Sequence, residues 1–556
     1  MHQPHAQPRA SIYYRYEVFP AAPRPDVETH VPVVVVGAGP IGLHAALDLA
    51  RHGVPVLLLA AERQVSEGSR AIVYTRRSME ILHTVGVAEA IERRGLSWRH
   101  GNSFVRGQCV FRMEAPHDDD ERFMPMTNLQ QQFLEQTLVE AAARQPLVSI
   151  RWGHKVIGVS QTARGAVLEV DTADGPYRQP CDWVVAADGA RSTLRQQLDL
   201  RMEGAAYEGR FVIADIRIDL PYPTERRAYF EPDWNPGNTV LMHREPEGIW
   251  RIDYQLPTGE TPEQALAPES LKARIDAQLA MIGHAGLPWQ MDWCSVYSAR
   301  AMTLPDYVSG RVIFTGDAAH LLPIFGVRGA NTGFQDAQNL AWKLAAVVKG
   351  QAGPGLLASY SHERVGAARE IIDEAGKSTR FMTPPTRGYR LLRDATLSLS
   401  LSQDFVRPLF HWRTSRAHVY ARSPLNCLDD DDGRFTAGPA VGAPMLDARL
   451  SPGGHLMDGF APASHLLVFG AGAVAAARDA AARTALPVKV WAVTADGRAA
   501  GADRGVADPE GRLARRHGVP SDGAVYLIRP DQHVAARWLQ ADSPRISAAL
   551  RRSHGH

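Results

Sequence analysis

The sequence has little cysteine, and its four cysteines show no pattern that would give them a joint role. Cys109, Cys181, Cys294 and Cys427 are far apart, and none belongs to a Cys-x-x-Cys pair or to a set with metal-ligand spacing. We therefore expect neither a disulfide framework nor a metal ion, and a reducing compartment is the default.

Long hydrophobic runs and a charge of one sign are also lacking. No stretch approaches the roughly 20 apolar residues of a membrane-spanning helix, and the N-terminal region has no signal-peptide core. The formal net charge of +1 gives no reason to expect a nucleic acid or an anionic membrane as partner. We expect a cytoplasmic protein, with no membrane and no nucleic acid as partner.

The chain is long enough for several domains. Its 556 residues suit two to four domains, and 45% apolar and 22% charged residues are typical of a globular protein.

One stretch, residues 311–344, predicts a strand, a glycine-rich turn and a helix. The strand formers Val312–Thr315 lead into Gly316 and Asp317, and glycines at 326, 329 and 333 follow. An Asp at a strand end can accept hydrogen bonds from sugar-like hydroxyls, and close glycines let the backbone approach a flat ring. The stretch therefore predicts a cofactor seat, and the alternative is an ordinary connection between strand and helix.

A second motif near the N-terminus predicts a dinucleotide site. The strand Val31–Val36 is followed by Gly37-Ala38-Gly39-Pro40-Ile41-Gly42 and a helix, which is the context that this glycine fingerprint requires. The acid that should follow the second strand is replaced by Ala60. Glu62, two residues later, is the candidate to bind the adenosine ribose, with a backbone carbonyl or water as alternatives.

These motifs, with Asp188-Gly189 after a third buried strand, closely resemble the flavoprotein aromatic hydroxylases, in the branch of phenol hydroxylase and 3-(3-hydroxyphenyl)propionate hydroxylase. The resemblance implies non-covalent FAD at Gly37, Gly39, Pro40 and Gly42, at Asp188, and at Gly316 and Asp317. It further assigns these residues to the flavin: Arg70, Gln131, Pro323, Gly329 and Asn331.

Alternatives remain for some of these residues. Arg70 could be a surface arginine at a turn, and Gln130 could take the place of Gln131. The sequence also departs from the family at Ile324, where a second proline is usual, and at Val327-Arg328.

The predicted fold is α/β, with a Rossmann-like FAD-binding domain, an inserted, mostly antiparallel substrate sheet and a C-terminal thioredoxin-like domain without Cys-x-x-Cys. The expected segments are a tail (1–30), the FAD-binding domain (31–210 and, with a helical segment, 298–428), the middle sheet (211–297), a linker (429–444) and the last domain (445–556). Gly470–Ala475 is a superficial second fingerprint, because too little chain follows for another doubly wound domain. The last domain is expected to serve packing or a homodimer.

The resemblance implies a monooxygenase that hydroxylates a phenolic ring with NAD(P)H and dioxygen through a flavin hydroperoxide. A base for the phenol proton would help, and we predict Asp253 for this role. Arg244 is expected to help hold the phenolate or a substrate carboxylate. The alternative for Asp253 is a structural ion pair with Arg251 or another cation. The strand alternation puts Arg251 and Asp253 on one face, which looks either at the flavin or at solvent. A flavin epoxidase, a polyketide-tailoring hydroxylase and a non-catalytic flavin-binding protein remain alternative functions.

Overall fold

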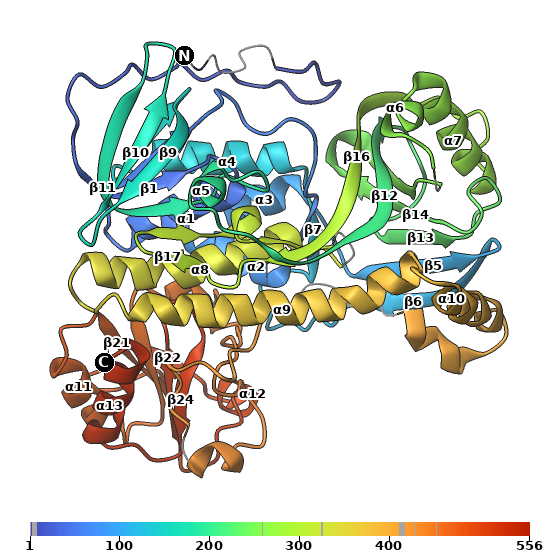
Figure 1. Cartoon of the computed structure of the whole chain (residues 1–556). Helices are drawn as coiled ribbons and strands as arrows, with labels where there is room; N and C mark the ends of the chain where they lie inside the picture. The colour runs from blue at the N-terminus through green and yellow to red at the C-terminus, as the bar shows by residue number, and fades with distance from the viewer. Residues whose placement is uncertain are drawn as a thin grey trace.

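The computed structural model describes residues 2, 8–257, 259–323, 326–410, 417–428, 430–451 and 453–556. Figure 1 shows three sheet-based bodies, with the long helix α9 (Leu356–Met382) passing beneath the first two and above the C-terminal domain. The predicted α/β fold class is confirmed.

The first sheet brings the ends of its central strands to one edge. Five strands run parallel in the order β18-β11-β1-β2-β8, and Val36 lies beside both Leu59 and Ala186. Their valine and leucine runs are buried, as expected for a parallel sheet covered by helices. The strands are β1 (Val31–Val36), β2 (Val56–Ala60), β8 (Val148–Trp152), β11 (Tyr177–Ala186) and β18 (Val312–Phe314), extended by β9 (Lys155–Gln161), β10 (Ala166–Asp171) and β17 (Val308–Ser309).

The helices α1, α4 and α8 pack in this domain, and α1 contacts both others. A small sheet of β3, β7 and β4 lies beside them. The bounds are α1 (Pro40–Arg51), α2 (Arg76–Thr84), α3 (Ala88–Arg94), α4 (Gln131–Ala143), α5 (Thr193–Gln197), α8 (Gly329–Val348), β3 (Val73–Thr75), β4 (Leu96–Trp98) and β7 (Met126–Asn128).

The middle sheet has the order β19-β16-β12-β15-β14-β13-β5-β6 and is antiparallel except between β13 and β5. It takes up β5 and β6, which the sequence placed in the first part of the FAD-binding domain. One face packs apolar side chains against α7 (Pro268–Met281). The strands are β5 (His100–Val105), β6 (Gln108–Glu114), β12 (Glu203–Arg217), β13 (Arg226–Phe230), β14 (Thr239–Glu245), β15 (Ile249–Gln255), β16 (Gln290–Thr303) and β19 (His320–Leu321).

The C-terminal domain is built on a mixed sheet in the order β22-β21-β20-β23-β24, with helices α11, α12 and α13. Its bounds are β20 (Ser464–Phe469), α11 (Val474–Ala482), β21 (Val488–Thr494), β22 (Arg504–Ala507), α12 (Arg512–Arg516), β23 (Ala524–Ile528), β24 (Val534–Trp538) and α13 (Ser543–Ser553). Within the described residues, no helix is both long and apolar enough to span a bilayer.

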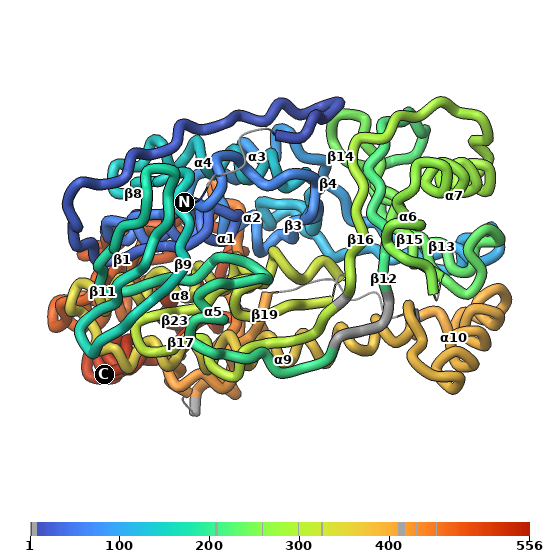
Figure 2. The backbone as a smooth tube through the Cα atoms, turned by 45° about the horizontal axis from the view of Figure 1, so that its top comes forward, coloured from blue at the N-terminus to red at the C-terminus, as the bar shows by residue number. Residues whose placement is uncertain are grey.

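The N-terminal segment is packed along the molecule rather than loose (Figure 2). Tyr14, Tyr16 and Phe19 are buried. Arg9 pairs with Asp292 on β16 at 2.8 Å, and the Tyr16 hydroxyl accepts a hydrogen bond from the Gly68 N–H at 3.0 Å. The segment therefore links the middle sheet to the loop that precedes Arg70.

Candidate active site

The predicted fingerprint forms a tight turn between β1 and α1. Gly37 has a φ of +108°, and a Cβ atom there would lie 2.4 Å from the carbonyl oxygen of Ala187. A Cβ atom at Gly42 would lie 2.0 Å from the Gly37 oxygen, so only glycine permits this packing. At Gly39 no atom lies within 4 Å of the Cβ position, and Pro40 begins the helix. The turn is closed toward the protein and open where a pyrophosphate would meet the helix N-terminus.

Two carboxylates follow the neighbouring strands β11 and β18 at the same sheet edge. Asp188 accepts a hydrogen bond from the Leu194 N–H at 3.2 Å through Oδ2, while its Oδ1 is buried without a partner. Burial raises the pKa of Asp188. The protein atoms around Asp317 raise its pKa, against the opposing charges of His320, Arg70 and Arg195. The residue still reaches solvent, and within the described part of the chain it accepts no hydrogen bond. Both side chains thus keep unused acceptor oxygens.

Gly316 and Asp336 hold this strand end in place. Gly316 has a φ of +57° and donates its N–H to Asp336 at 3.2 Å. Asp336 also accepts from Arg364 and His320, each at 2.6 Å. Burial acts to raise the pKa of Asp336, but these two partners outweigh it and lower the pKa. Asp336 is therefore a fully partnered carboxylate beside the free Asp317.

The start of α8 combines an open backbone with a fully used side chain. No atom lies within 4 Å of a Cβ position at Gly329, and Pro323 is buried. The Asn331 amide donates to Val73 and Val327 carbonyls and accepts from the Thr75 N–H at 2.9 Å. Any contact of Asn331 with a flavin would therefore involve its backbone. Ile324, one of the two departures from the family, lies outside the described residues.

Arg70 and Gln131 lie on two segments that hydrogen bonds join. The Gln131 oxygen accepts from the Ala71 N–H at 3.0 Å, and its Nε2 donates to the buried Glu135 at 2.7 Å. The exposed Arg70 acts on both Asp317 and Glu135 through its charge. Gln131 thus holds the loop that carries Arg70, which gives its amide a structural use.

The end of β2 supplies no acid. The Ala60 and Glu62 carbonyls accept backbone N–H groups of His154 and Gly153, and the Glu62 residue is exposed in the bend that follows. The Ala60 carbonyl is therefore already engaged by one hydrogen bond, and the Glu62 carboxylate stays the predicted ribose ligand, with a backbone carbonyl or water as alternatives.

The polar face of β15 looks at the FAD-binding domain, which decides the question that the alternation left open. Arg251 is buried and donates to Asp215 at 2.9 Å, to the Ser69 hydroxyl at 2.6 Å and to the Arg70 carbonyl at 3.0 Å. Glu245 lies 3.5 Å from Arg251, but both of its carboxylate oxygens lack a hydrogen bond. The middle sheet and the flavin-side loop thus meet at one buried arginine.

Asp253 shares this face but not these hydrogen bonds. Its Oδ1 lies 4.0 Å from Arg251 Nε and is buried without a hydrogen-bond partner. Its side chain is 14% exposed. Burial raises the pKa of Asp253 to about 7, with Arg251 and Arg226 opposing. The donors of Arg251 are engaged elsewhere, and the buried Arg226 is the second cation whose charge acts on Asp253.

Arg244 lies on the opposite face of the sheet from Asp253. It is the register partner of Trp250, and its Nη1 donates to the Tyr222 carbonyl at 2.9 Å. Since neighbouring residues of a strand point to opposite faces, His243 rather than Arg244 shares the face of Asp253. Arg244, which was predicted to help hold the phenolate or a substrate carboxylate, therefore does not lie beside Asp253.

Comparisons with known proteins agree with this geometry. The family described as FAD binding domain matches residues 30–375. The chain belongs to this family. A 3-(3-hydroxy-phenyl)propionate/3-hydroxycinnamic acid hydroxylase of Burkholderia vietnamiensis is 30% identical over 67% of this chain and 67% of its own length. A 6-methylpretetramide 4-monooxygenase of Streptomyces rimosus is 29% identical over 94% of this chain and 93% of its own.

A solved structure shows the same fold. The flavin-dependent monooxygenase PieE, in complex with FAD and substrate, is 26% identical with a TM-score of 0.77, over 95% of this chain and 99% of its own. The predicted resemblance is confirmed, and with it the enzyme class, an FAD- and NAD(P)H-dependent aromatic monooxygenase.

The residues of this family member fit FAD. The open turn at Gly39 faces helix N–H groups suited to a pyrophosphate, and Asp188 and Asp317 hold unused acceptors suited to hydroxyl groups. The clear surroundings of Gly329 leave room for a flat ring beside the start of α8.

Sequence reasoning missed three side chains that the structure brings to this region. Asp215 and Ser69 flank Arg251, and burial, with the charge of Asp317, raises the pKa of Tyr297 to about 12. Their signal in the sequence was weak, because Ser69 is adjacent to Arg70 and the two others lie in alternating strands.

Proposed function

We propose that this monooxygenase hydroxylates a phenol held beside the polar face of β15, with Asp253 accepting the phenolic proton. The observation that carries the proposal is the Asp253 carboxylate, whose Oδ1 is buried and without a hydrogen bond and whose pKa is about 7. A base with a pKa near the working pH combines a useful ionised fraction with a useful driving force.

The residues of the chain bind, orient and move the proton. When bound, FAD would take two electrons from NAD(P)H and pass one atom of dioxygen to the ring, and the other oxygen atom would be released as water. Asp253 takes the phenol proton, which makes the ring more electron-rich. Arg251 holds the loop of Ser69 and Arg70 against the middle sheet. It thereby sets the distance between the polar face of β15, where the substrate would lie, and the loop at the predicted flavin seat.

The length of the match favours a polycyclic phenol as a second candidate substrate. The 6-methylpretetramide monooxygenase matches over nearly the whole chain, including the C-terminal domain, whereas the phenylpropionate hydroxylase covers two thirds. The substrate class of the 6-methylpretetramide monooxygenase therefore serves as the model for this second candidate.

The experiment follows NAD(P)H oxidation by FAD-loaded enzyme with and without substrates. Substituted phenols, 3-(3-hydroxyphenyl)propionate and a polycyclic phenol are compared, and products are analysed by mass spectrometry for one added oxygen. The proposal expects stimulated oxidation and a hydroxylated product. FAD-loaded protein that forms no such product with any phenol would favour an epoxidase or a non-catalytic flavin protein.

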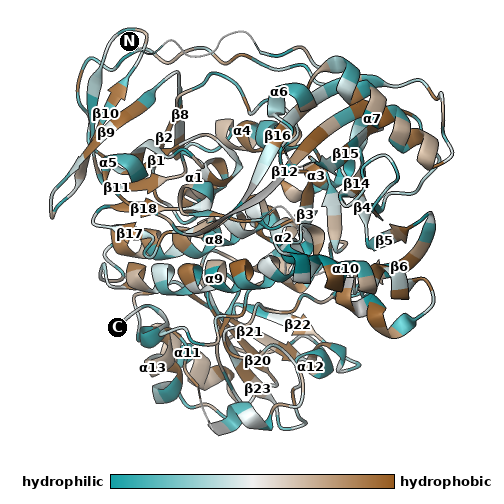
Figure 3. Ribbon diagram, turned by 45° about the vertical axis from the view of Figure 1, so that its right-hand side comes forward, coloured by the Kyte–Doolittle hydropathy of each residue, from teal (hydrophilic) through white to brown (hydrophobic). Residues whose placement is uncertain are grey.

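We further propose that two copies of the chain pair through α10 (Arg387–Ser400) and the turn after it. Figure 3 shows hydrophobic residues on this helix. The large exposed apolar side chains here are Tyr389, Leu391, Leu392, Leu399, Phe405 and Leu409. Light scattering should show a dimer that Leu391→Glu dissociates and that Val27→Glu, at another exposed site, leaves intact.

A further inference from the structure

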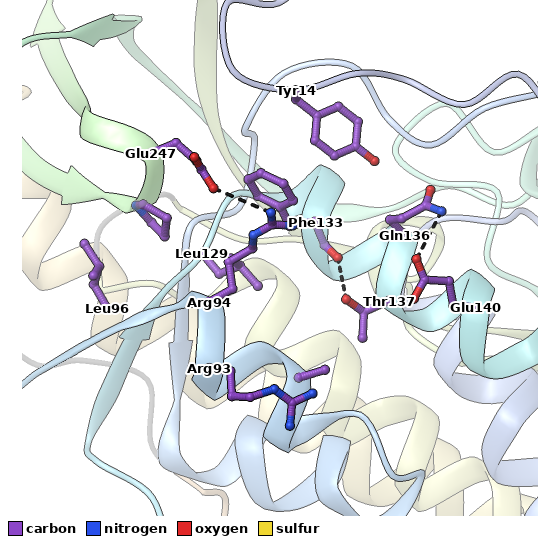
Figure 4. Close-up of a pocket in the computed structure, with 12 residues that line it drawn as sticks. Tyr14, Arg93, Arg94, Leu96, Leu129, Phe133, Gln136, Thr137, Glu140 and Glu247 are labelled. Atoms are coloured by element: carbon purple, nitrogen blue, oxygen red, sulfur yellow. Dashed lines mark hydrogen bonds and ion pairs between the residues drawn. The ribbon is translucent and has the colours of Figure 1, made fainter.

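A cavity of about 630 Å³ lies outside the flavin seat (Figure 4). Four parts of the chain line it: the N-terminal segment, α3 with β4, α4, and the turn between β14 and β15. Its volume is within the range of small-molecule sites, and none of the predicted FAD ligands lines it.

The floor of the cavity is apolar and aromatic. Leu129 and Phe133 are buried, and the ring of Tyr14 meets that of Phe133 edge-on at 5.0 Å. These side chains expose little area themselves, and the guanidinium of Arg94 covers the Phe133 ring, so a flat ring would stack on that guanidinium.

Two adjacent arginines stand at the rim. Arg94 lies over the Phe133 ring at 3.9 Å and 3.6 Å from Glu247. Arg93 is exposed and makes neither an ion pair nor a hydrogen bond with the residues that the structure describes. Arginine presents a planar fork of donors that matches a phosphate, so Arg93 is an available phosphate ligand.

Acceptors complete the lining. Gln136 donates to Glu140 at 3.4 Å and to Glu17 at 3.1 Å, which leaves its Oε1 buried and without a partner. Glu247 sits at a φ of +65°, an uncommon conformation for a residue other than glycine. The ribose hydroxyls and the amino group of an adenine nucleotide would donate hydrogen bonds to these acceptors. A simple aromatic acid would bring only a further negative charge.

The cavity adjoins the flavin-side loop through a shared segment. Gln131 bonds to Ala71 beside Arg70, while Leu129 and Phe133 on the same segment line the cavity. The fingerprint at Gly37 fits the dinucleotide of FAD, so the NAD(P)H co-substrate needs a different seat. A nucleotide in the cavity would lie next to the loop that carries Arg70.

From these contacts we infer that the cavity binds the adenine nucleotide half of NADPH, with the 2′-phosphate at Arg93. The inference rests on the proposed function, in that it seats the co-substrate of that reaction. It also assigns a preference for NADPH over NADH, since Arg93 would have no phosphate to bind in NADH.

The test is calorimetric titration of FAD-loaded enzyme with 2′,5′-ADP and with 5′-ADP. We expect 2′,5′-ADP to bind more tightly, and Arg93→Ala to weaken it by about tenfold or more, as for loss of a charge-assisted hydrogen bond. Arg144→Ala is the matched control, because Arg144 is also exposed and unpartnered in the described structure, at the end of α4. Arg93→Lys should recover part of the affinity.

Two results would overturn the inference: equal binding of the two nucleotides by the parent enzyme, or an unchanged affinity in Arg93→Ala. Failure of the proposed function looks different. In that case 2′,5′-ADP still binds through Arg93, but no phenol is hydroxylated. Conversely, if phenols are hydroxylated but Arg93→Ala does not change nucleotide binding, the nucleotide site is disproved and the proposed function stands.

Discussion

Two clusters of buried charges, one on the middle sheet and one where the C-terminal domain meets α8 and α9, use the same residue types differently. In the interdomain cluster, Arg529 donates to Glu363 at 2.6 and 2.9 Å and to Asp531 at 3.0 Å, while Lys343 donates to Glu363 at 2.7 Å. Two cations thus face two carboxylates. Burial acts to raise the pKa of Glu363, but Arg529 and Lys343 outweigh it and lower the pKa.

The middle-sheet cluster is neither balanced nor saturated. Arg251 faces the carboxylates of Asp215, Glu245 and Asp253, and of these three described carboxylates only that of Asp215 accepts a hydrogen bond from it. Burial raises the pKa of Glu245 well above its usual range and that of Asp253 to about 7. The difference teaches that a saturated cluster fixes two domains together, whereas unsatisfied carboxylates mark a site where protons can move.

The largest expected effect is on stability, in the saturated cluster. Arg529→Met leaves Glu363 and Asp531 buried without their main cation, and we expect a loss of about 3–5 kcal/mol in the free energy of unfolding. Urea unfolding measures it. Arg478→Ala, which breaks an exposed pair with Asp503, is the control and should cost under about 1 kcal/mol. Equal losses in the two variants would contradict the structural role of the interdomain cluster.

The unsaturated cluster should respond in activity instead. We expect Asp253→Asn to slow hydroxylation by about a hundredfold while FAD content and flavin reduction are kept. The parent rate should rise through pH of about 7, because Asp253 must be ionised to accept a proton. The variant should recover partly at higher pH, as the phenol, with a pKa of about 10, begins to ionise unaided.

A neighbouring carboxylate supplies the control for Asp253. Burial raises the pKa of Glu245 well above its usual range, and Glu245→Gln keeps the length and shape of the side chain, so this variant should lose less of the hydroxylation rate than Asp253→Asn. Rapid single-turnover measurements separate reduction from hydroxylation. If Asp253→Asn hydroxylates like the parent across the pH range, Asp253 is not the base.

The same contrast can be sharpened at the flavin seat, where Asp317 is free and Asp336 is saturated. Asp317→Ala should yield largely apoprotein with little change in stability, since it removes an acceptor that no described protein group uses. Asp336→Asn should instead reduce stability, because it breaks the buried pair with Arg364. Flavin absorbance per protein and thermal unfolding give the two readouts. A fully loaded Asp317→Ala variant would disprove the assignment of Asp317.

Much of the flavin seat could be predicted from the sequence because each motif is local. A strand, a glycine turn and a helix start within a dozen residues, and Gly37 and Asp317 lie where their motifs imply. Parallel pairing then brings the strand ends to one edge without any further information.

The middle-sheet site could be predicted only in part, because it depends on register and on distant contacts. Arg244 was assigned to the same substrate site as Asp253, but a shift of one residue along a strand moves a side chain to the other face. The bond between Arg251 and Ser69 joins residues 182 positions apart, and no local pattern indicates it. The amide of Asn331 is likewise used by β3 and its surroundings, which the sequence of its own helix does not reveal.

The smallest expected effect concerns the cysteines, and it tests whether any thiol takes part in the reaction. All four are free thiols, and Cys427 near α13 has its pKa raised by burial, which disfavours a reactive thiolate. Replacing all four by Ser should therefore leave turnover within a few fold, while the interdomain cluster around Arg529 still holds the domain in place. Turnover per bound FAD is the measurement, so that any loss of folded protein is counted separately. A drop of more than about tenfold, or roughly 1.4 kcal/mol in activation free energy, in properly loaded enzyme would mean that a thiol takes part in the reaction.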